Sequence, residues 1–236
     1  MRTMKNNWGT LVWSLDFARN DTICVCNQKQ CPILLGSIFV ENIQTYLGKK
    51  DQRLQDIIEQ IELPEIKPTG NLFHDLMSCI LEQQIHYRST KKTFARLLEK
   101  AEIEELSLEN FEIFEEKALE GFKMSMNKVE TLGRVLGFFQ HEQPVWENLE
   151  DKVIRKILSG IKGVGPWTQE MLLMYSLERK DIFPAQDYHL KLVMGNVYGI
   201  EAKVSQMKAI ASEWIPYRST AVRYLLAWKA AQKGKK

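Results

Sequence analysis

The feature that most constrains this chain is the stretch Leu158-Ser-Gly-Ile-Lys-Gly-Val-Gly-Pro-Trp-Thr168. It ends one amphipathic helical pattern, passes through a glycine-rich turn and opens a second helix at Pro166. Gly163 and Gly165 permit backbone conformations that residues with a Cβ resist, and proline fits the first turn of a helix, where its missing N–H costs nothing. Such a turn leaves backbone N–H groups pointing outward at the positive end of a helix, where they can bind phosphate.

Composition describes an ordinary globular protein. The 236 residues are 44% hydrophobic and 10% aromatic, which is enough to bury a core in one large domain or two small ones. No apolar run approaches the ~20 residues that span a membrane, and the N-terminus lacks the pattern of a secretory signal. Four cysteines in a chain of this size argue against a disulfide framework. We therefore expect an intracellular protein without membrane contact, located in the cytoplasm or nucleoid of a bacterium or in the nucleus of a eukaryote.

Charge is unevenly distributed along the chain. The net charge is only +2, but residues 151–236 carry 15 Lys and Arg against 7 Asp and Glu, whereas residues 1–150 carry 17 against 23. The basic part contains the glycine-rich turn. This asymmetry is compatible with one face that meets phosphates, and equally with a solvated surface that ends in a basic tail.

Residues 1–50 read as an N-terminal extension with short strands. Apolar residues alternate with others from Leu11 to Ala18, the period-2 pattern of a strand, and Thr22-Ile-Cys-Val-Cys26 follows a plausible turn. Cys24, Cys26 and Cys31 form a cluster, but three thiols with no nearby histidine are a poor zinc set. We expect no metal here.

Residues 51–236 read as one helical domain. Apolar residues recur at helical spacing almost throughout, most clearly between Leu72 and Leu81. The pattern predicts an all-α fold, with helices over residues 51–62, 72–81 and 128–139, a helical hairpin over about 150–177, and helices near 188–198, 204–214 and 219–231.

Four motifs in this order resemble the helix-hairpin-helix DNA glycosylase superfamily over roughly residues 51–232. They are Leu81-Glu-Gln-Gln-Ile85, the hairpin with Trp167-Thr168, Pro184-x-x-Asp187-Tyr188, and Glu213-Trp-Ile-Pro-Tyr-Arg-Ser219. The similarity is greatest to the DNA-3-methyladenine glycosylase II enzymes of alkylation repair. It implies two helical subdomains that flank a DNA-binding cleft, and a monomer that flips alkylated purines out of duplex DNA and hydrolyses their N-glycosidic bond, leaving an abasic site.

The resemblance implies that Asp187 is the catalytic carboxylate. An Asp that opens a helix is ordinarily its N-cap, and the two roles can coexist. Cleavage of an N-glycosidic bond develops positive charge on the sugar ring, and a fixed carboxylate beneath that ring stabilises the charge and can orient the attacking water.

The resemblance also assigns a base pocket and a reaction type. Relatives that cleave the backbone carry a Lys where this chain has Trp167, because a Schiff base requires an amine. A monofunctional enzyme is therefore implied, with Trp167 in the base pocket and core packing as its alternative role. Trp214 matches the base-stacking Trp of the subfamily, and a cationic base over an indole gains ~0.5–2 kcal/mol. A buried anchor at the end of a helix stays open as the alternative role of Trp214. Tyr188 is expected to line the same pocket. Met171 stands where the subfamily often has an aromatic residue, and its thioether can pack on a base.

Two segments are expected to contact DNA. The hairpin is expected to bind phosphate, and the Gln pair is expected to fill the gap that a flipped base leaves. The residues are Lys162, Gly163, Val164, Gly165 and Thr168 in the hairpin, and Gln83 and Gln84 as the wedge.

No cofactor is expected, apart from a monovalent cation that the hairpin could bind at its phosphate contact. The iron–sulfur cluster of some relatives needs four cysteines near the C-terminus, and this chain has none after Cys79. Two alternatives stay open: a non-catalytic helix-hairpin-helix DNA-binding module, and a glycosylase for oxidised or mismatched bases.

Overall fold

The computed structural model describes residues 2–5, 11–14, 24–25, 42–66, 68–82 and 87–233. The chain divides into two compact units, Met1–Val40 and Glu41–Lys236. The first unit contains strands β1 (Arg2–Lys5), β2 (Leu11–Ser14) and β3 (Cys24–Val25), which form an antiparallel sheet in the order β1-β2-β3. Strands form where the sequence predicted them after residues 10 and 21, although β2 and β3 are shorter than expected. Cys31 lies outside the described residues.

The second unit is helical in its described part, as the sequence predicted. Its helices are α1 (Ile43–Lys50), α2 (Gln52–Ile58), α3 (Leu72–Leu81), α4 (Tyr87–Ala101), α5 (Phe111–Phe114), α6 (Met126–His141), α7 (Asp151–Ser159), α8 (Pro166–Met171), α9 (Tyr188–Tyr198), α10 (Val204–Ala211) and α11 (Arg218–Lys233), with π-helical turns η1 (Glu115–Leu119) and η3 (Leu172–Ser176) and 3-10 turns η2 (Trp146–Asn148) and η4 (Ser212–Trp214). None of the described helices is both long and apolar enough to cross a membrane.

Helix α3 is the centre of one group of helices. Asn71 caps its first turn, where its side-chain oxygen accepts a hydrogen bond from the His74 N–H at 3.0 Å. Six of its ten residues are buried, because apolar side chains recur at positions that share a face. These side chains pack α3 against α4, α6, α8 and η3. The predicted helix over 72–81 is confirmed at both ends.

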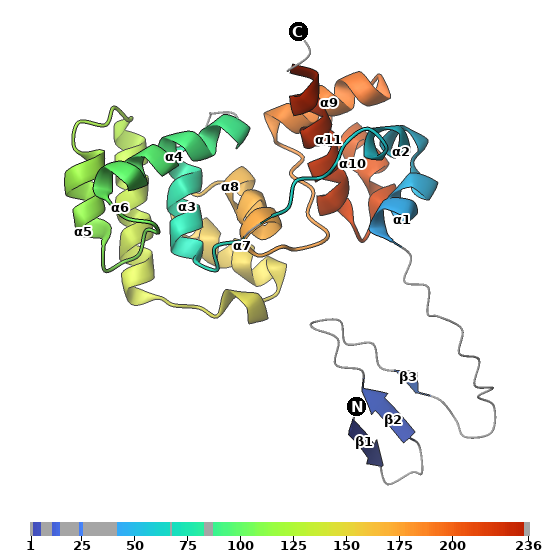
Figure 1. The fold of residues 1–236 in the computed structure, drawn as a ribbon, viewed down its shortest axis with the longest axis horizontal. Helices are drawn as coiled ribbons and strands as arrows, with labels where there is room; N and C mark the ends of the chain where they lie inside the picture. Colours follow the sequence, from blue (N-terminus) through green and yellow to red (C-terminus); the bar gives the residue numbers. More distant parts are fainter. Residues whose placement is uncertain are drawn as a thin grey trace. The chain divides into compact units, whose positions relative to one another are not determined.

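A second group brings the two ends of the unit together. In Figure 1 the blue helices α1 and α2 lie near the red end of the chain, where α2 packs against α11 and α1 packs against η4, although more than 140 residues separate them in sequence. Asp51 connects them: Oδ1 accepts from the Leu54 N–H at 3.1 Å, and Oδ2 accepts from Tyr198 Oη at 2.7 Å and Trp214 Nε1 at 2.9 Å. Helix α1, which the sequence analysis assigned to the N-terminal extension, therefore packs within the helical unit.

The segment between the two groups is held by side chains of α11. Arg218 forms a two-pronged ion pair with Asp181, with Nε 2.6 Å from Oδ1 and Nη2 2.8 Å from Oδ2. Ser219 is buried, and its Oγ donates to the Arg179 carbonyl at 2.5 Å and accepts from the Ile182 N–H at 2.9 Å. These contacts fix the path of the chain that leads to the start of α9.

Candidate active site

The two helix groups meet at Asp187, the residue that precedes α9. Its Oδ1 accepts a hydrogen bond from the Leu190 N–H at 2.7 Å, so Asp187 is the N-cap of α9. Its Oδ2 accepts a hydrogen bond from Trp167 Nε1 of α8, also at 2.7 Å. The side chain is only 7% exposed. Both oxygens of a nearly buried carboxylate are therefore fixed by donors from two different helices, which gives the group a single orientation.

Helix α8 presents its residues to two different environments. Trp167 is half-buried and faces Asp187, whereas Thr168 is buried on the side of α3, where its hydroxyl hydrogen-bonds Cys79. Burial raises the pKa of the Cys79 thiol to about 12, so it stays protonated. Met171 is 6% exposed and belongs to the core. The side chains of Thr168 and Met171 are therefore not at the surface, against the prediction that they contact DNA and base.

The hairpin between α7 and α8 has the geometry that its glycines predict. Gly163 has a φ of +106°, and a Cβ there would lie 2.2 Å from Thr131 Oγ1 of α6. Gly165 has a φ of −80° and precedes Pro166, with no heavy atom within 4 Å of a Cβ added to it. In the described part of the chain, the backbone N–H groups of Gly163 and Gly165 donate to no protein acceptor. Two donors at an exposed turn are thus available to an anion.

Three carbonyl groups of the hairpin each accept a hydrogen bond from within the protein. Ile161 O accepts from the Val164 N–H at 3.0 Å, Lys162 O from Arg134 Nη1 at 3.3 Å, and Val164 O from Gln169 Nε2 at 3.2 Å. The Lys162 side chain is exposed, while Val164 is 4% exposed and anchors the turn in the core.

Trp214 lies in the interior of the protein and not in an open base pocket. Its side chain is 0% exposed, it packs against the rings of Phe183 and Tyr198 at 6.1 and 6.2 Å between centroids, and its indole N–H donates to Asp51. An indole enclosed on all sides cannot stack on a base in this arrangement. The base-stacking role is therefore replaced by a structural one: Trp214 anchors η4 to α1, α2 and α9.

Tyr188 is the aromatic residue that is exposed beside Asp187. Its side chain is 66% exposed and lies one residue after the carboxylate. The ammonium group of Lys229 lies 5.9 Å from its ring centroid, a distance at which a cation is attracted to an aromatic face. Lys191 donates a hydrogen bond to Gln186 Oε1 at 2.8 Å. The surface around the start of α9 therefore carries an aromatic ring and two cations.

Sequence reasoning missed Glu170. This half-buried side chain lies on α8, three residues after Trp167, and in the described part of the chain no hydrogen bond holds its carboxyl group. Burial raises its pKa to about 7, the negative charge of Asp187 adds to the increase, and the charges of Arg155 and Lys208 oppose it. A Glu inside a helix gives no sequence signal for this, because the pKa depends on residues distant in sequence.

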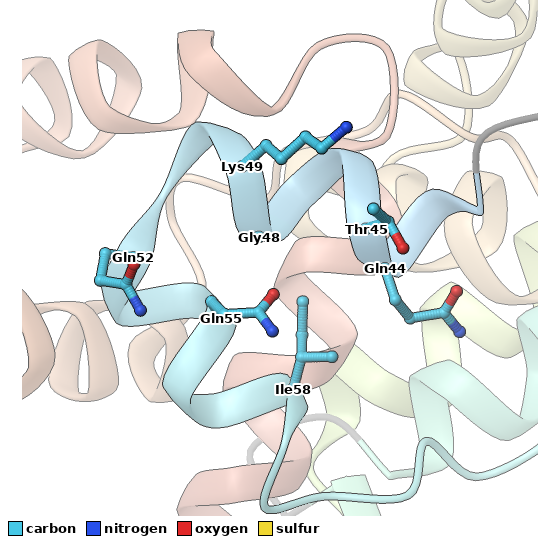
Figure 2. A pocket seen from close by; sticks show the side chains of 7 residues that line it. All are labelled: Gln44, Thr45, Gly48, Lys49, Gln52, Gln55 and Ile58. Atoms are coloured by element: carbon cyan, nitrogen blue, oxygen red, sulfur yellow. The ribbon is translucent and has the colours of Figure 1, made fainter.

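Other parts of the described structure do not join this site. The predicted wedge residues, Gln83 and Gln84, lie outside the described residues. A hollow of about 370 Å³ lies between α1 and α2 and is lined mainly by polar side chains from both helices, together with Gly48 and Ile58 (Figure 2). None of the residues around Asp187 lines it. Among the described residues, no group of His, Cys, Asp and Glu side chains is arranged to hold a metal.

Residues 77–217, a segment that includes the hairpin, Asp187 and Trp214, match the family model described as HhH-GPD superfamily base excision DNA repair protein. The Bacillus subtilis protein YfjP is 34% identical over 87 residues, 36% of this chain and 30% of that protein. DNA-3-methyladenine glycosylase 1 of Schizosaccharomyces pombe is 26% identical over 168 residues, 68% of this chain and 72% of the relative. The crystal structure of a DNA-3-methyladenine glycosidase from Bacillus halodurans superposes with a TM-score of 0.64 at 27% identity, and the match covers 84% of this chain and 92% of that structure.

Proposed function

Because the chain belongs to the HhH-GPD superfamily of base excision DNA repair proteins, we propose that it is a DNA glycosylase that hydrolyses the N-glycosidic bond of alkylated purines in duplex DNA. The observation that carries this proposal is the carboxylate of Asp187, fixed by Trp167 and by the first turn of α9. The names of the relatives from Schizosaccharomyces pombe and Bacillus halodurans support 3-methyladenine as a substrate of this type.

The fixed carboxylate supplies the charge that the reaction requires. As the bond between C1′ and the base breaks, the sugar becomes an oxocarbenium ion, and a carboxylate that needs no reorientation stabilises it. Trp167 contributes by holding Oδ2 of Asp187, and the Leu190 N–H contributes by holding Oδ1. Water then attacks C1′, and the product is an abasic site. An alkylated purine such as 3-methyladenine is cationic and already a good leaving group, so Asp187 can act without a partner acid.

Trp167 supports a monofunctional reaction. An indole cannot form the Schiff base that strand cleavage requires, and its N–H group is engaged with Asp187. Lys162 is exposed on the hairpin, where it suits contact with phosphate. The reaction therefore releases the base and leaves the strand intact.

The hairpin is the proposed anchor on the DNA backbone. The outward N–H groups of Gly163 and Gly165 suit a phosphate oxygen, and Lys162 and Arg134 add positive charge beside them. Tyr188, exposed next to Asp187, and the half-buried Trp167 are the remaining candidates for contact with a flipped base. Contacts of this kind position the duplex without reading its sequence.

A gel assay tests the proposal. Duplexes that contain 3-methyladenine, 7-methylguanine, 8-oxoguanine or a mismatch are incubated with the full chain and resolved with and without alkali. We expect cleavage of the two methylated duplexes only after alkali, and no covalent adduct after borohydride. Breaks without alkali, or an adduct trapped by borohydride, would contradict the monofunctional reaction. Binding without release of any base would identify a non-catalytic module instead.

A further inference from the structure

We propose that Glu170 is a proton donor to the departing base, which extends the reaction to damaged purines that carry no charge. This inference rests on the proposed glycosylase function. Trp167 and Glu170 are three residues apart on α8, so their side chains are neighbours on one side of that helix. Trp167 contacts the carboxylate of Asp187 directly, and the charge of Asp187 also acts on Glu170. Trp167 therefore lies beside both carboxyl groups, in contact with Asp187 and three residues from Glu170 on the same helix.

The two carboxyl groups differ in what holds them. Both oxygens of Asp187 accept hydrogen bonds from N–H donors, which suits an anion. The carboxyl group of Glu170 has no such donor in the described part of the chain and is half-buried, which favours the neutral acid. One fixed anion beside one carboxylic acid is the arrangement that divides glycosidic catalysis between a charge stabiliser and a proton donor.

The charges that face Glu170 come from three other elements. Burial disfavours the ionised form of Glu170 most strongly, Arg155 of α7 and Lys208 of α10 favour that form, and Asp187 at the start of α9 adds to the effect of burial. Helix α3 presents Cys79 to Thr168 and not to this side of α8. Bound DNA adds phosphate charge and excludes water, and both effects favour the neutral acid further. Glu170 would therefore hold its proton near neutral pH when a base has to leave.

The proton is needed only for some lesions. Methylation at a ring nitrogen makes the purine cationic, so its glycosidic bond breaks to give a neutral base. An uncharged lesion such as hypoxanthine would leave as an anion unless a ring nitrogen gains a proton. In the proposed step, the Glu170 O–H bond breaks and the proton bonds to that nitrogen, while the electron pair of the C1′–N9 bond leaves with the base. Water bonds to C1′, and the proton it loses returns to the Glu170 carboxylate.

Single-turnover release of 7-methylguanine and of hypoxanthine, measured between pH 5 and 9, tests the proposal. General acid catalysis contributes on the order of 10²–10⁴-fold, so Glu170→Gln should slow hypoxanthine release by at least about 100-fold at pH 6. Release of 7-methylguanine should change by no more than about threefold, because that base needs no added proton. In the wild type, hypoxanthine release should fall as the pH rises through the pKa of Glu170, and this dependence should vanish in the variant. Glu201→Gln, the same change at an exposed site, is the control.

Three results would overturn the role of Glu170: equal losses for both lesions, hypoxanthine release that survives Glu170→Gln, or a wild type that releases 7-methylguanine but no hypoxanthine at any pH. A melting curve for each variant separates these results from loss of folded protein. Failure of the glycosylase function itself has a different signature, since the wild type would then release neither base, or Asp187→Asn would leave 7-methylguanine release unchanged.

Discussion

Replacing Gly163 by alanine adds one methyl group at a place where the structure has no room for it. The new Cβ would lie 2.2 Å from Thr131 Oγ1 and 2.6 Å from Thr131 Cγ2, and the backbone φ of +106° is unfavourable for any residue with a Cβ. The backbone contributes about 1–2 kcal/mol of destabilisation, since left-handed conformations cost that much in L-residues. Overpacking against α6 contributes about 1–3 kcal/mol more.

The expected destabilisation of Gly163→Ala is therefore about 2–5 kcal/mol, or a melting temperature lower by roughly 4–20 °C for a helical unit of this size. Gly165→Ala is the matched control, because it lies two residues away with a φ of −80° and no heavy atom within 4 Å of an added Cβ. It should cost no more than about 1 kcal/mol, the difference between glycine and alanine at an N-cap. Thermal unfolding followed by circular dichroism measures both.

DNA binding separates the two roles of the glycines. If the backbone at Gly165 approaches a phosphate closely, Gly165→Ala should weaken binding to damaged and undamaged duplex alike while the fold stays intact. In Gly163→Ala, adding Thr131→Ala removes the two nearest clashing atoms and should restore part of the stability. Equal melting temperatures for the two single variants, or no recovery in the double variant, would refute the packing argument.

Two further predictions concern the interior. Trp214→Ala should destabilise the fold by about 3–5 kcal/mol, as expected for a large aromatic side chain removed from a core. It should reduce excision of cationic and uncharged lesions in proportion. A selective loss for cationic lesions at unchanged stability would restore the base-stacking role. Glu170→Gln should raise the melting temperature at pH 8 and leave it unchanged near pH 4. The pKa of Glu170 is about 7 in the folded protein against 4.5 in the unfolded chain, so ionisation of this carboxyl group disfavours folding above pH 4.5. A variant less stable than the wild type at pH 8 would contradict the burial of this carboxyl group.

Local patterns were sufficient for the elements that place the site. The apolar spacing in residues 72–81 and the glycines before Pro166 encode a buried helix and a tight turn, and both signals act over a few residues. The position of Asp187 before a helical pattern likewise predicted its capping role, which the structure confirms. Helix α1 gave a weaker signal, because only two of its eight residues, Leu47 and Gly48, are buried.

Contacts between distant residues could not be predicted in the same way. Trp214 is enclosed because Asp51, 163 positions earlier, accepts its indole N–H, and a motif of aromatic residues does not distinguish a ring in a core from a ring in a pocket. Thr168 turns inward because Cys79 of α3 lies behind α8. The raised pKa of Glu170 depends on its burial and on charges from α7, from α10 and from Asp187 before α9. Each of these properties exists only once the helices have packed.

The most direct test of the proposed function is single-turnover release of 7-methylguanine by Asp187→Asn, measured beside its affinity for the same duplex. Asn can cap α9 as well as Asp does, so the fold and DNA binding should be retained within a few-fold. The charge that stabilises the oxocarbenium ion is lost, and release should slow by at least about 100-fold, the size of effect that a single preorganised electrostatic contact has in other enzymes. Release at close to the wild-type rate by a folded, DNA-bound Asp187→Asn protein would contradict the assignment of Asp187 as the catalytic carboxylate.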